Sequence, residues 1–254
     1  MSSIRLEHLT SPEAGAAIAN GFTTAVFGVG AVEQHGPHLP MFMDAEHGTR
    51  MAVEVATRLG HTLVAPTIRV GCSDHHMSFP GSLTVRAETL EALCRDYCTS
   101  LARHGFTRIL IIPTHGGNFA PLRTMAPRLQ EAVAGRSRVL IYTDVMDLIA
   151  VWRRATAELS ELADRVGGHA DVAETSVMLA IHPELVQMDR AEEGFRGELD
   201  EAVLARMIKD GLHTVTANGI LGDARGATAA IGERCITRLA DRIAGYFREL
   251  SGAD

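Results

Sequence analysis

The chain has 254 residues, of which 46% are hydrophobic and 22% are charged, a composition typical of a globular protein with a sizeable core. Its formal charge is −7 and its basic residues are scattered, which argues against nucleic acid as a partner, because phosphate binding needs clustered Lys and Arg. No apolar stretch approaches the roughly 18 residues that span a bilayer, so no membrane partner is expected.

The cysteines and the first residues bear on the cellular compartment. Four cysteines, at positions 72, 94, 98 and 235, are too few for a disulfide scaffold in a chain of this length. Cys94 and Cys98 are four residues apart on a predicted helix, where a disulfide would be strained. The chain starts without the basic and then apolar pattern of a secretion signal. We therefore expect reduced thiols and a cytoplasmic location.

The order of apolar segments predicts an α/β fold. Apolar runs rich in β-branched residues predict buried strands at 23–30, 63–70, 108–113 and 139–143. Helical periodicity is found at 46–59, 86–104, 119–134, 172–181, 200–210 and 227–250. This alternation implies right-handed crossovers and a mostly parallel sheet covered on both faces. We expect one domain, 1–254, in which the polar segment 147–168 forms a lid or an oligomer contact.

Twelve histidines, most of them between residues 35 and 115, indicate metal binding or proton transfer in this half of the chain. Ligands of open parallel sheets lie at the carboxyl ends of strands, and the polar segments 30–38, 71–76 and 114–118 follow the first three predicted strands. Glu33 and His35 stand at i and i+2 of an extended segment, so their side chains point the same way and can face one pocket.

Two further positions extend this predicted site. Asp44 lies just before a helix expected to begin near residue 45, and a carboxylate there can bridge two cations; a helix N-cap is the simpler reading of Asp44 alone. His115 ends the third predicted strand. The missing side chains of Gly116 and Gly117 leave room for a metal or substrate and let backbone N–H groups approach. Taken singly, His115 is equally a core histidine and the glycine pair a turn.

Downstream, Gly167 and Gly168 predict a flexible turn before the helix at 172–181. Glu174 lies in the first turn of that helix, where the helix dipole favours a carboxylate, and an ordinary first-turn Glu is the alternative. His169 in this segment either moves protons or caps the helix. The segment 218–223 predicts a tight loop in which Asp223 is structural rather than catalytic.

Five motifs, taken in order, resemble the creatininase family, the creatinine amidohydrolases, over nearly the whole chain. They are GVGAVEQHGPHLP (28–40) with Asp44, CSDHHMSFPGSLT (72–84), THGGN (114–118), GGHADVAETS (167–176) and NGILGDARGAT (218–228). The resemblance implies a three-layer α/β/α fold, a site with two divalent ions, and hydrolysis of a carbon–nitrogen bond in a cyclic or formyl amide. It also implies a homohexamer and a small-molecule substrate.

The resemblance also implies roles for single residues. The family's metal ligands match Glu33, His35, Asp44 and His115, with Asp44 as the bridge. His169 matches a histidine that shuttles protons. In true creatininases a glutamate at the position of Gly117 binds the second ion; here we expect Glu174 to take that place as a ligand and to act in catalysis. The expected substrate-binding residues are His76, Gly116, Gly117 and Asn118.

Mixed nitrogen and oxygen ligands suit Zn²⁺ first, with Mn²⁺ and Fe²⁺ as alternatives, better than Ca²⁺. The Gly117 departure argues against creatinine as the substrate. A second departure is His75, which replaces an acid found in relatives and changes which charges the pocket accepts. Fold similarity does not choose among a deformylase, a peptidase that trims the mycofactocin precursor and a hydrolase that opens a keto-inositol ring. A non-catalytic metal-binding oligomer is the remaining alternative.

Overall fold

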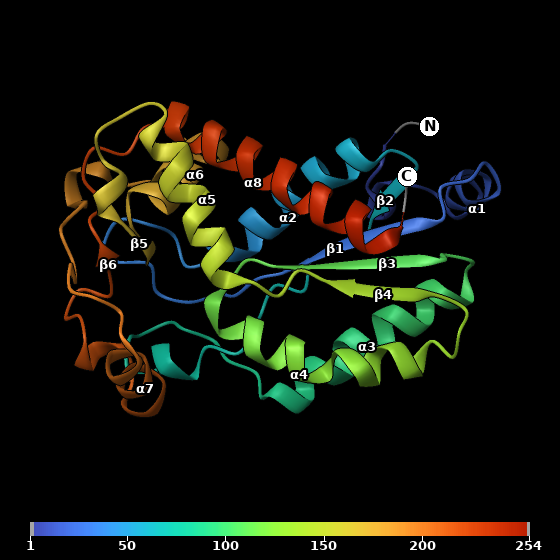
Figure 1. Ribbon diagram of the computed structural model, residues 1–254, viewed down its shortest axis with the longest axis horizontal. Coiled ribbons are helices and arrows are strands. Elements are labelled where there is room, and N and C mark those ends of the chain that lie inside the picture. The colour runs from blue at the N-terminus through green and yellow to red at the C-terminus, as the bar shows by residue number, and fades with distance from the viewer. Residues whose placement is uncertain (1–2, 253–254) are drawn as a thin grey trace.

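The computed structural model describes residues 3–252, so residues 1, 2, 253 and 254 of the expected domain lie outside it. Its centre is a parallel four-stranded sheet in the order β2-β1-β3-β4 (Figure 1). The strands are β1 (Thr24–Val29), β2 (Thr62–Val64), β3 (Arg108–Pro113) and β4 (Arg138–Ile141). Every residue of β1 is buried, as expected for a central strand covered on both faces.

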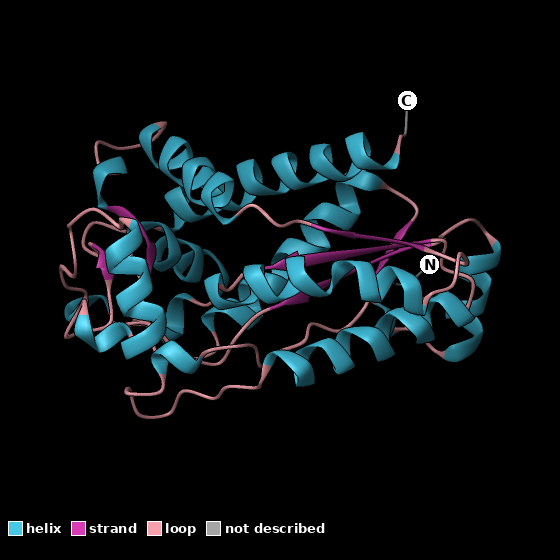
Figure 2. Ribbon diagram, turned by 60° about the horizontal axis from the view of Figure 1, so that its bottom comes forward, coloured by secondary structure: helices cyan, strands magenta, loops and turns pink. Residues whose placement is uncertain are grey.

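Helices cover both faces of this sheet, which confirms the predicted three-layer α/β/α fold (Figure 2). One layer holds α2 (Met43–Leu59), α5 (Val145–Ala157), α6 (Val172–Ile181) and α8 (Ala229–Ser251); the other holds α3 (Ala87–Arg103) and α4 (Gly116–Ala132). Val26 and Leu110 pack into the first layer, whereas their neighbours Phe27 and Ile111 pack into the second. The period of two along a strand thus builds two cores from one sheet.

A second sheet, which the sequence did not predict, pairs β5 (Val166–His169) with β6 (Leu221–Gly222) in antiparallel fashion. The predicted flexible turn at Gly167 and Gly168 is therefore wrong, because both residues lie within β5. A Cβ atom on Gly167 would come within 2.4 Å of the Leu221 carbonyl oxygen, so this glycine permits close backbone approach. The side chain of Asp171 accepts from the backbone N–H groups of Gly167 and Gly168 and caps α6.

Other predicted bounds change for local reasons. The strand predicted at 63–70 ends at Val64, and Pro66, which lacks a backbone N–H, interrupts the ladder before Ile68 pairs again with Val29. Much of the segment expected to be a lid at 147–168 is α5. The remaining helices are α1 (Ser11–Ala19), α7 (Glu201–Asp210) and the 3-10 turns η1 (Leu6–His8), η2 (Asp74–His76), η3 (Ala163–Arg165), η4 (Pro183–Leu185), η5 (Met188–Arg190) and η6 (Leu212–Thr214).

None of the helices within residues 3–252 combines the length and apolarity needed to cross a bilayer.

Candidate metal centre

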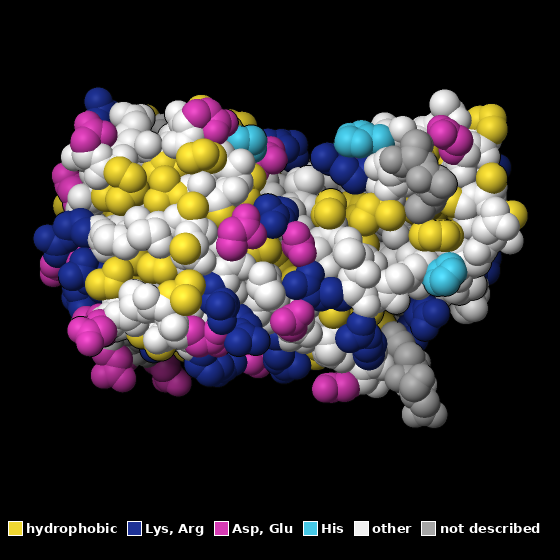
Figure 3. Space-filling model, turned by 90° about the horizontal axis from the view of Figure 1, so that it is seen from above, with side chains coloured by type: hydrophobic (Ala, Val, Ile, Leu, Met, Phe, Trp, Pro, Cys, Tyr) yellow, Lys and Arg dark blue, Asp and Glu magenta, His cyan; other side chains and the backbone are white. Residues whose placement is uncertain are grey.

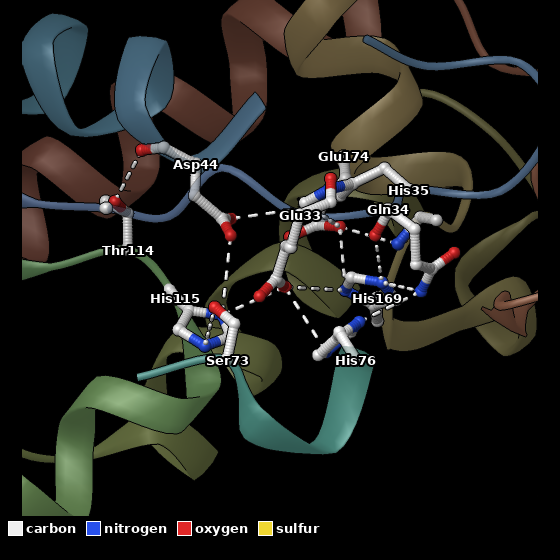
Figure 4. Close-up of polar contacts among 12 residues, drawn as sticks. Glu33, Gln34, His35, Asp44, Ser73, His76, Thr114, His115, His169 and Glu174 are labelled. Atoms are coloured by element: carbon white, nitrogen blue, oxygen red, sulfur yellow. Dashed lines mark hydrogen bonds and ion pairs between the residues drawn. The ribbon is translucent and has the colours of Figure 1, made fainter. Parts of the chain in front are cut away.

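The five side chains predicted to bind metal meet at the carboxyl edge of the parallel sheet, where all are buried (Figure 4). Glu33 and His35 follow β1, and His115 follows β3 at the N-cap of α4. Asp44 lies inside the first turn of α2, whose N-cap residue is Phe42, so the N-cap reading of Asp44 is wrong. Glu174 lies in the first turn of α6, as predicted.

Asp44 lies between two histidines. Its Oδ1 atom is 3.5 Å from His35 Nε2, and its Oδ2 atom is 3.4 Å from His115 Nδ1. On the His115 side, Glu33 Oε1 is 3.0 Å from Nδ1; on the His35 side, Glu174 Oε2 is 3.7 Å from Nε2. Three groups of three potential ligands result among the described residues, each with ligand atoms within 4.8 Å of one another: Glu33–Asp44–His115, His35–Asp44–Glu174 and Glu33–His35–His169. Asp44 belongs to the first two groups.

The histidine rings are oriented by backbone carbonyl groups, which can only accept hydrogen bonds. His35 Nδ1 donates to the Glu33 carbonyl oxygen at 3.1 Å, and His115 Nε2 donates to that of Cys72 at 3.0 Å. The remaining nitrogen of each ring therefore faces the carboxylates. An outward N–H on a carbonyl and an inward nitrogen is the arrangement that metal-binding histidines adopt in proteins.

The buried carboxylates favour positive charge on the groups beside them. Burial opposes protonation of His35, but Asp44, Glu174 and Glu33 outweigh it and raise the pKa of this imidazole to about 10. The pKa of His115 also rises well above its ordinary value despite burial, because Glu33 and Asp44 are close. Among the described residues neither Glu33 carboxylate oxygen accepts a hydrogen bond of ordinary geometry, although His115 Nδ1 and His76 Nε2 lie 3.0 and 3.3 Å from Oε1. The protons on His35 and His115 thus lie where divalent cations would fit, and metal binding would displace these protons.

His169 forms the third side of the cluster. Its Nδ1 atom is 4.0 Å from both Glu33 Oε1 and Glu174 Oε2, and its Nε2 atom lies 3.0 Å from the Gln34 carbonyl oxygen. Burial, together with the nearby His35, lowers the pKa of His169 well below its ordinary value, so the ring is neutral. Asp171, not His169, supplies the side-chain cap of α6. The helix-cap alternative for His169 is therefore wrong.

The residues expected to contact substrate occupy different places. A cavity of about 30 Å³ is lined by Gly116 but not by His76, Gly117 or Asn118. A Cβ atom on Gly117 would lie 2.2 Å from the Cys72 carbonyl oxygen, so the space beside this glycine is filled by the backbone of the chain itself. Asn118 links the segment after β1 to the loop at Cys72, because its side-chain amide donates to the Gly30 carbonyl oxygen and accepts from the Cys72 N–H group.

The sequence did not identify two contributors to the site. Gln34, between the two motif residues Glu33 and His35, hydrogen-bonds across the cluster, and no spacing pattern singles it out. The wall of the cavity opposite the carboxylates comes from α5, with Val145, Leu148, Ile149 and Trp152. In this case a signal existed, because Leu148, Val151, Trp152 and Ala155 follow the three- and four-residue steps of a buried helical face.

A parallel α/β sheet with a buried histidine–carboxylate cluster at its carboxyl edge is an arrangement typical of metal-dependent hydrolases. The chain belongs to the creatininase family, whose model, described as creatinine amidohydrolase, matches residues 7–247.

Its relatives differ in activity. The chain is 34% identical over 223 residues to the mycofactocin precursor peptide peptidase of Mycobacterium ulcerans, covering 84% of this chain and 80% of that protein. It is 31% identical over 204 residues to the creatinine amidohydrolase of Pseudomonas putida, covering 74% and 75%. Solved creatininases, one named "Creatininase Mn" and one a mutant of "Zn-Zn type", match with a TM-score of 0.78 and 28% identity over 98% of both chains.

Proposed function

We propose that this hydrolase cleaves an amide-like carbon–nitrogen bond with two divalent ions held by Glu33, His35, Asp44, His115 and Glu174. The observation that carries the proposal is the position of Asp44, whose two oxygens face His35 on one side and His115 on the other. A shared carboxylate between two ligand groups suits a dinuclear site. Imidazole and carboxylate ligands favour Zn²⁺, with Mn²⁺ or Fe²⁺ as alternatives.

The names of the relatives support the cleavage of a carbon–nitrogen bond of the amide type. An amidohydrolase and a peptide peptidase both cleave an amide bond between carbon and nitrogen. Ions bound at the cluster would supply Lewis-acid polarisation of a carbonyl and a water with a pKa lowered toward roughly 7. The chain's own part is to orient the ligands through the outward N–H groups of His35 and His115 and to exclude bulk water by burial.

His169 is the candidate proton carrier. Because its Nε2–H donates to the Gln34 carbonyl oxygen, its Nδ1 faces Glu33 and Glu174 and lines the cavity. Neutral Nδ1 can take a proton at this edge and pass it to a leaving nitrogen. The Glu174 carboxylate is held beside His169 by the Ala170 N–H group, which donates to Oε2 at 2.5 Å.

The cavity indicates the substrate's character. Its apolar wall on α5 faces the polar edge, and no Lys or Arg lines it in the described part of the chain. At about 30 Å³ the cavity has room for little more than a water molecule, so a substrate requires it to widen, and an uncharged group with an apolar side matches its lining. A free carboxylate would find no cation here other than bound metal ions.

The second candidate is cleavage at a peptide terminus. The higher identity to the peptidase, 34% against 31%, favours it, and so does Gly117 in place of the glutamate expected of true creatininases. A peptide longer than the cavity would require α5 or the loop before it to move outward. Opening of a keto-cyclitol ring is a third candidate, for which the same ligand set would serve.

The decisive experiment pairs metal analysis with a substrate screen. We expect two ions per chain, and turnover of small lactams, formamides or short peptides that is abolished by a chelator and restored by Zn²⁺ or Mn²⁺. Asp44→Asn should lose both ions, whereas Asp74→Asn, on the exposed side of η2, should keep them. Retention of both ions by Asp44→Asn would contradict the site assignment. His169→Ala should keep both ions and lose turnover by about 10²-fold or more.

Assembly as a homohexamer and a cytoplasmic location are also proposed, from the resemblance to the family. Hydrophobic side chains gather on one face, at the end of the molecule that carries α5 and α6 (Figure 3). Met146, Leu159 and Leu185 are among the exposed large apolar side chains. Contiguous exposed apolar surface is typical of interfaces between subunits. Light scattering coupled to size-exclusion chromatography measures the assembly directly; a monomer at micromolar concentration would contradict it.

A further inference from the structure

Gln34 has a side-chain amide whose orientation is fixed by two backbone groups. Its Oε1 atom accepts from Gly36 N–H at 3.0 Å, and its Nε2 atom donates to the Gly219 carbonyl oxygen at 3.1 Å. An N–H group can only donate and a carbonyl oxygen can only accept, so the amide cannot be reversed. A Cβ atom on Gly219 would lie 1.8 Å from Gln34 Oε1, which shows how tightly the amide is enclosed.

The second proton of this amide has two ring nitrogens within reach. Gln34 Nε2 is 2.9 Å from His169 Nε2 and 3.1 Å from His76 Nδ1. His169 Nε2 already lies 3.0 Å from the backbone carbonyl oxygen of Gln34, which can only accept a hydrogen bond. His169 Nε2 therefore carries a proton and cannot accept the amide proton. The amide proton is therefore donated to His76 Nδ1.

This leaves the proton of neutral His76 on Nε2, which is 3.3 Å from Glu33 Oε1 (Figure 4). The ring is packed beside those of His75 and His169, and because its Nδ1 atom accepts from the Gln34 amide, the single proton of the ring is on Nε2. An Nε2 atom that bears a proton cannot bind a cation.

We propose that Gln34 fixes the tautomer of His76, so that the Nε2–H group of His76 points toward Glu33 Oε1 and makes His76 a positioning residue that is prevented from binding metal. The proposal rests on the metal centre described above and deepens it. It also assigns His76 a role other than the expected substrate contact, in agreement with its place outside the cavity. Held at Oε1, the Glu33 carboxylate keeps one orientation toward His115 and Asp44. Partners of this kind typically change metal affinity by about 10–100-fold.

The direct test is ¹⁵N NMR of metal-free protein labelled at histidine. We expect His76 to show a protonated Nε2 and an unprotonated Nδ1, assigned by the signals lost in His76→Gln, and to keep this pattern after zinc is added. A proton on Nδ1, or loss of the Nε2 proton to zinc, would overturn the proposal. The metal-free measurement involves no turnover, so its failure would leave the proposed hydrolase function standing.

Two substitutions of His76 separate positioning from ligation. His76→Gln retains an amide N–H that can donate to Glu33, whereas His76→Leu removes the donor. Measured by competition with a chromophoric chelator, zinc affinity should stay close to that of the unchanged protein in the first variant and fall about 10–100-fold in the second. Equal losses in both variants would contradict the assigned role.

Gln34→Glu tests whether the Gln34 amide sets the tautomer of His76. A carboxylate cannot donate, so it should accept from His76 Nδ1 and move the ring proton to that atom, which the same NMR spectrum reports. An unchanged His76 tautomer in folded Gln34→Glu would overturn the role of Gln34. If this variant does not fold, because the Gly219 carbonyl loses its donor, the spectrum of the unchanged protein and the His76 pair still decide the question.

Discussion

Gly30 and Ala45 lie in direct backbone contact where β1 gives way to the segment that carries Glu33. A Cβ atom on Gly30 would come within 2.6 Å of Ala45 Cα, closer than real atoms approach. Since Asp44 precedes Ala45 in α2, this contact sets the distance between the Glu33 segment and Asp44. One glycine at the end of the strand therefore allows the two halves of the cluster to meet.

Gly30→Ala should push the start of α2 away from β1. We expect a loss of about 1–3 kcal/mol in the free energy of unfolding, from overpacking, together with reduced metal content. Chemical denaturation and metal analysis measure the two effects. Gly15→Ala is the matched control, because nothing lies within 4 Å of a Cβ atom there and the residue is inside α1, so stability should stay equal or rise. Normal metal content in Gly30→Ala would show that the contact does not position Asp44.

The sequence predicted most of the side chains that meet in this cluster because its information is local, whereas their binding of metal stays a prediction. Glu33 and His35 are two residues apart, and strand ends at one sheet edge bring His115 to them. It could not predict that the space of Gly117 is filled by the Cys72 carbonyl, since that contact depends on how the loop after β2 folds. It also missed β5 and β6, which are very short and pair residues more than fifty positions apart. That the chain forms a single domain stays a prediction.

Gly117 gives a second test of how the site differs from that of true creatininases. Gly117→Glu should not create an additional ligand, because the path of its Cβ atom is blocked by Cys72 O at 2.2 Å and by His115 Nε2 at 2.5 Å. We expect loss of metal and of stability instead. Gly116→Ala is the control, since a Cβ atom there meets nothing within 4 Å. Creatinine hydrolysis gained by Gly117→Glu would refute this view of the loop.

Ile149 on α5 offers a test of the cavity's apolar wall. It lines the cavity opposite Glu174, and its side chain also packs on Gly168. Ile149→Ala should leave both ions bound and enlarge the cavity. We expect kcat/KM to fall about 10-fold or more for the best small substrate and to fall less, or to rise, for a bulkier analogue. Equal changes for both substrates would indicate that α5 does not select by size.

Asp223 tests the prediction of a structural role away from the chemistry. Its carboxylate is 1% exposed and binds Arg225, whose Nε and Nη2 atoms each lie 2.9 Å from it, and it pairs with Arg165 at 3.3 Å. Burial alone would raise the pKa of Asp223, but hydrogen bonds and charge from Arg225 outweigh it and lower the pKa below its ordinary 3.8. The charged form is therefore the one that the folded state favours.

The sign of the pH effect follows from this direction. Because the pKa is depressed in the folded protein, the carboxylate's contribution to stability is complete above about pH 3.8 and is lost as the pH falls through the folded value. Asp223→Asn should thus lower the free energy of unfolding by about 1–3 kcal/mol at pH 7 and by progressively less below pH 4. Urea unfolding of both proteins across this range measures the difference, and metal content should be unchanged. A difference that stays constant down to pH 3 would mean that the charge of Asp223 contributes nothing and that only its shape is needed.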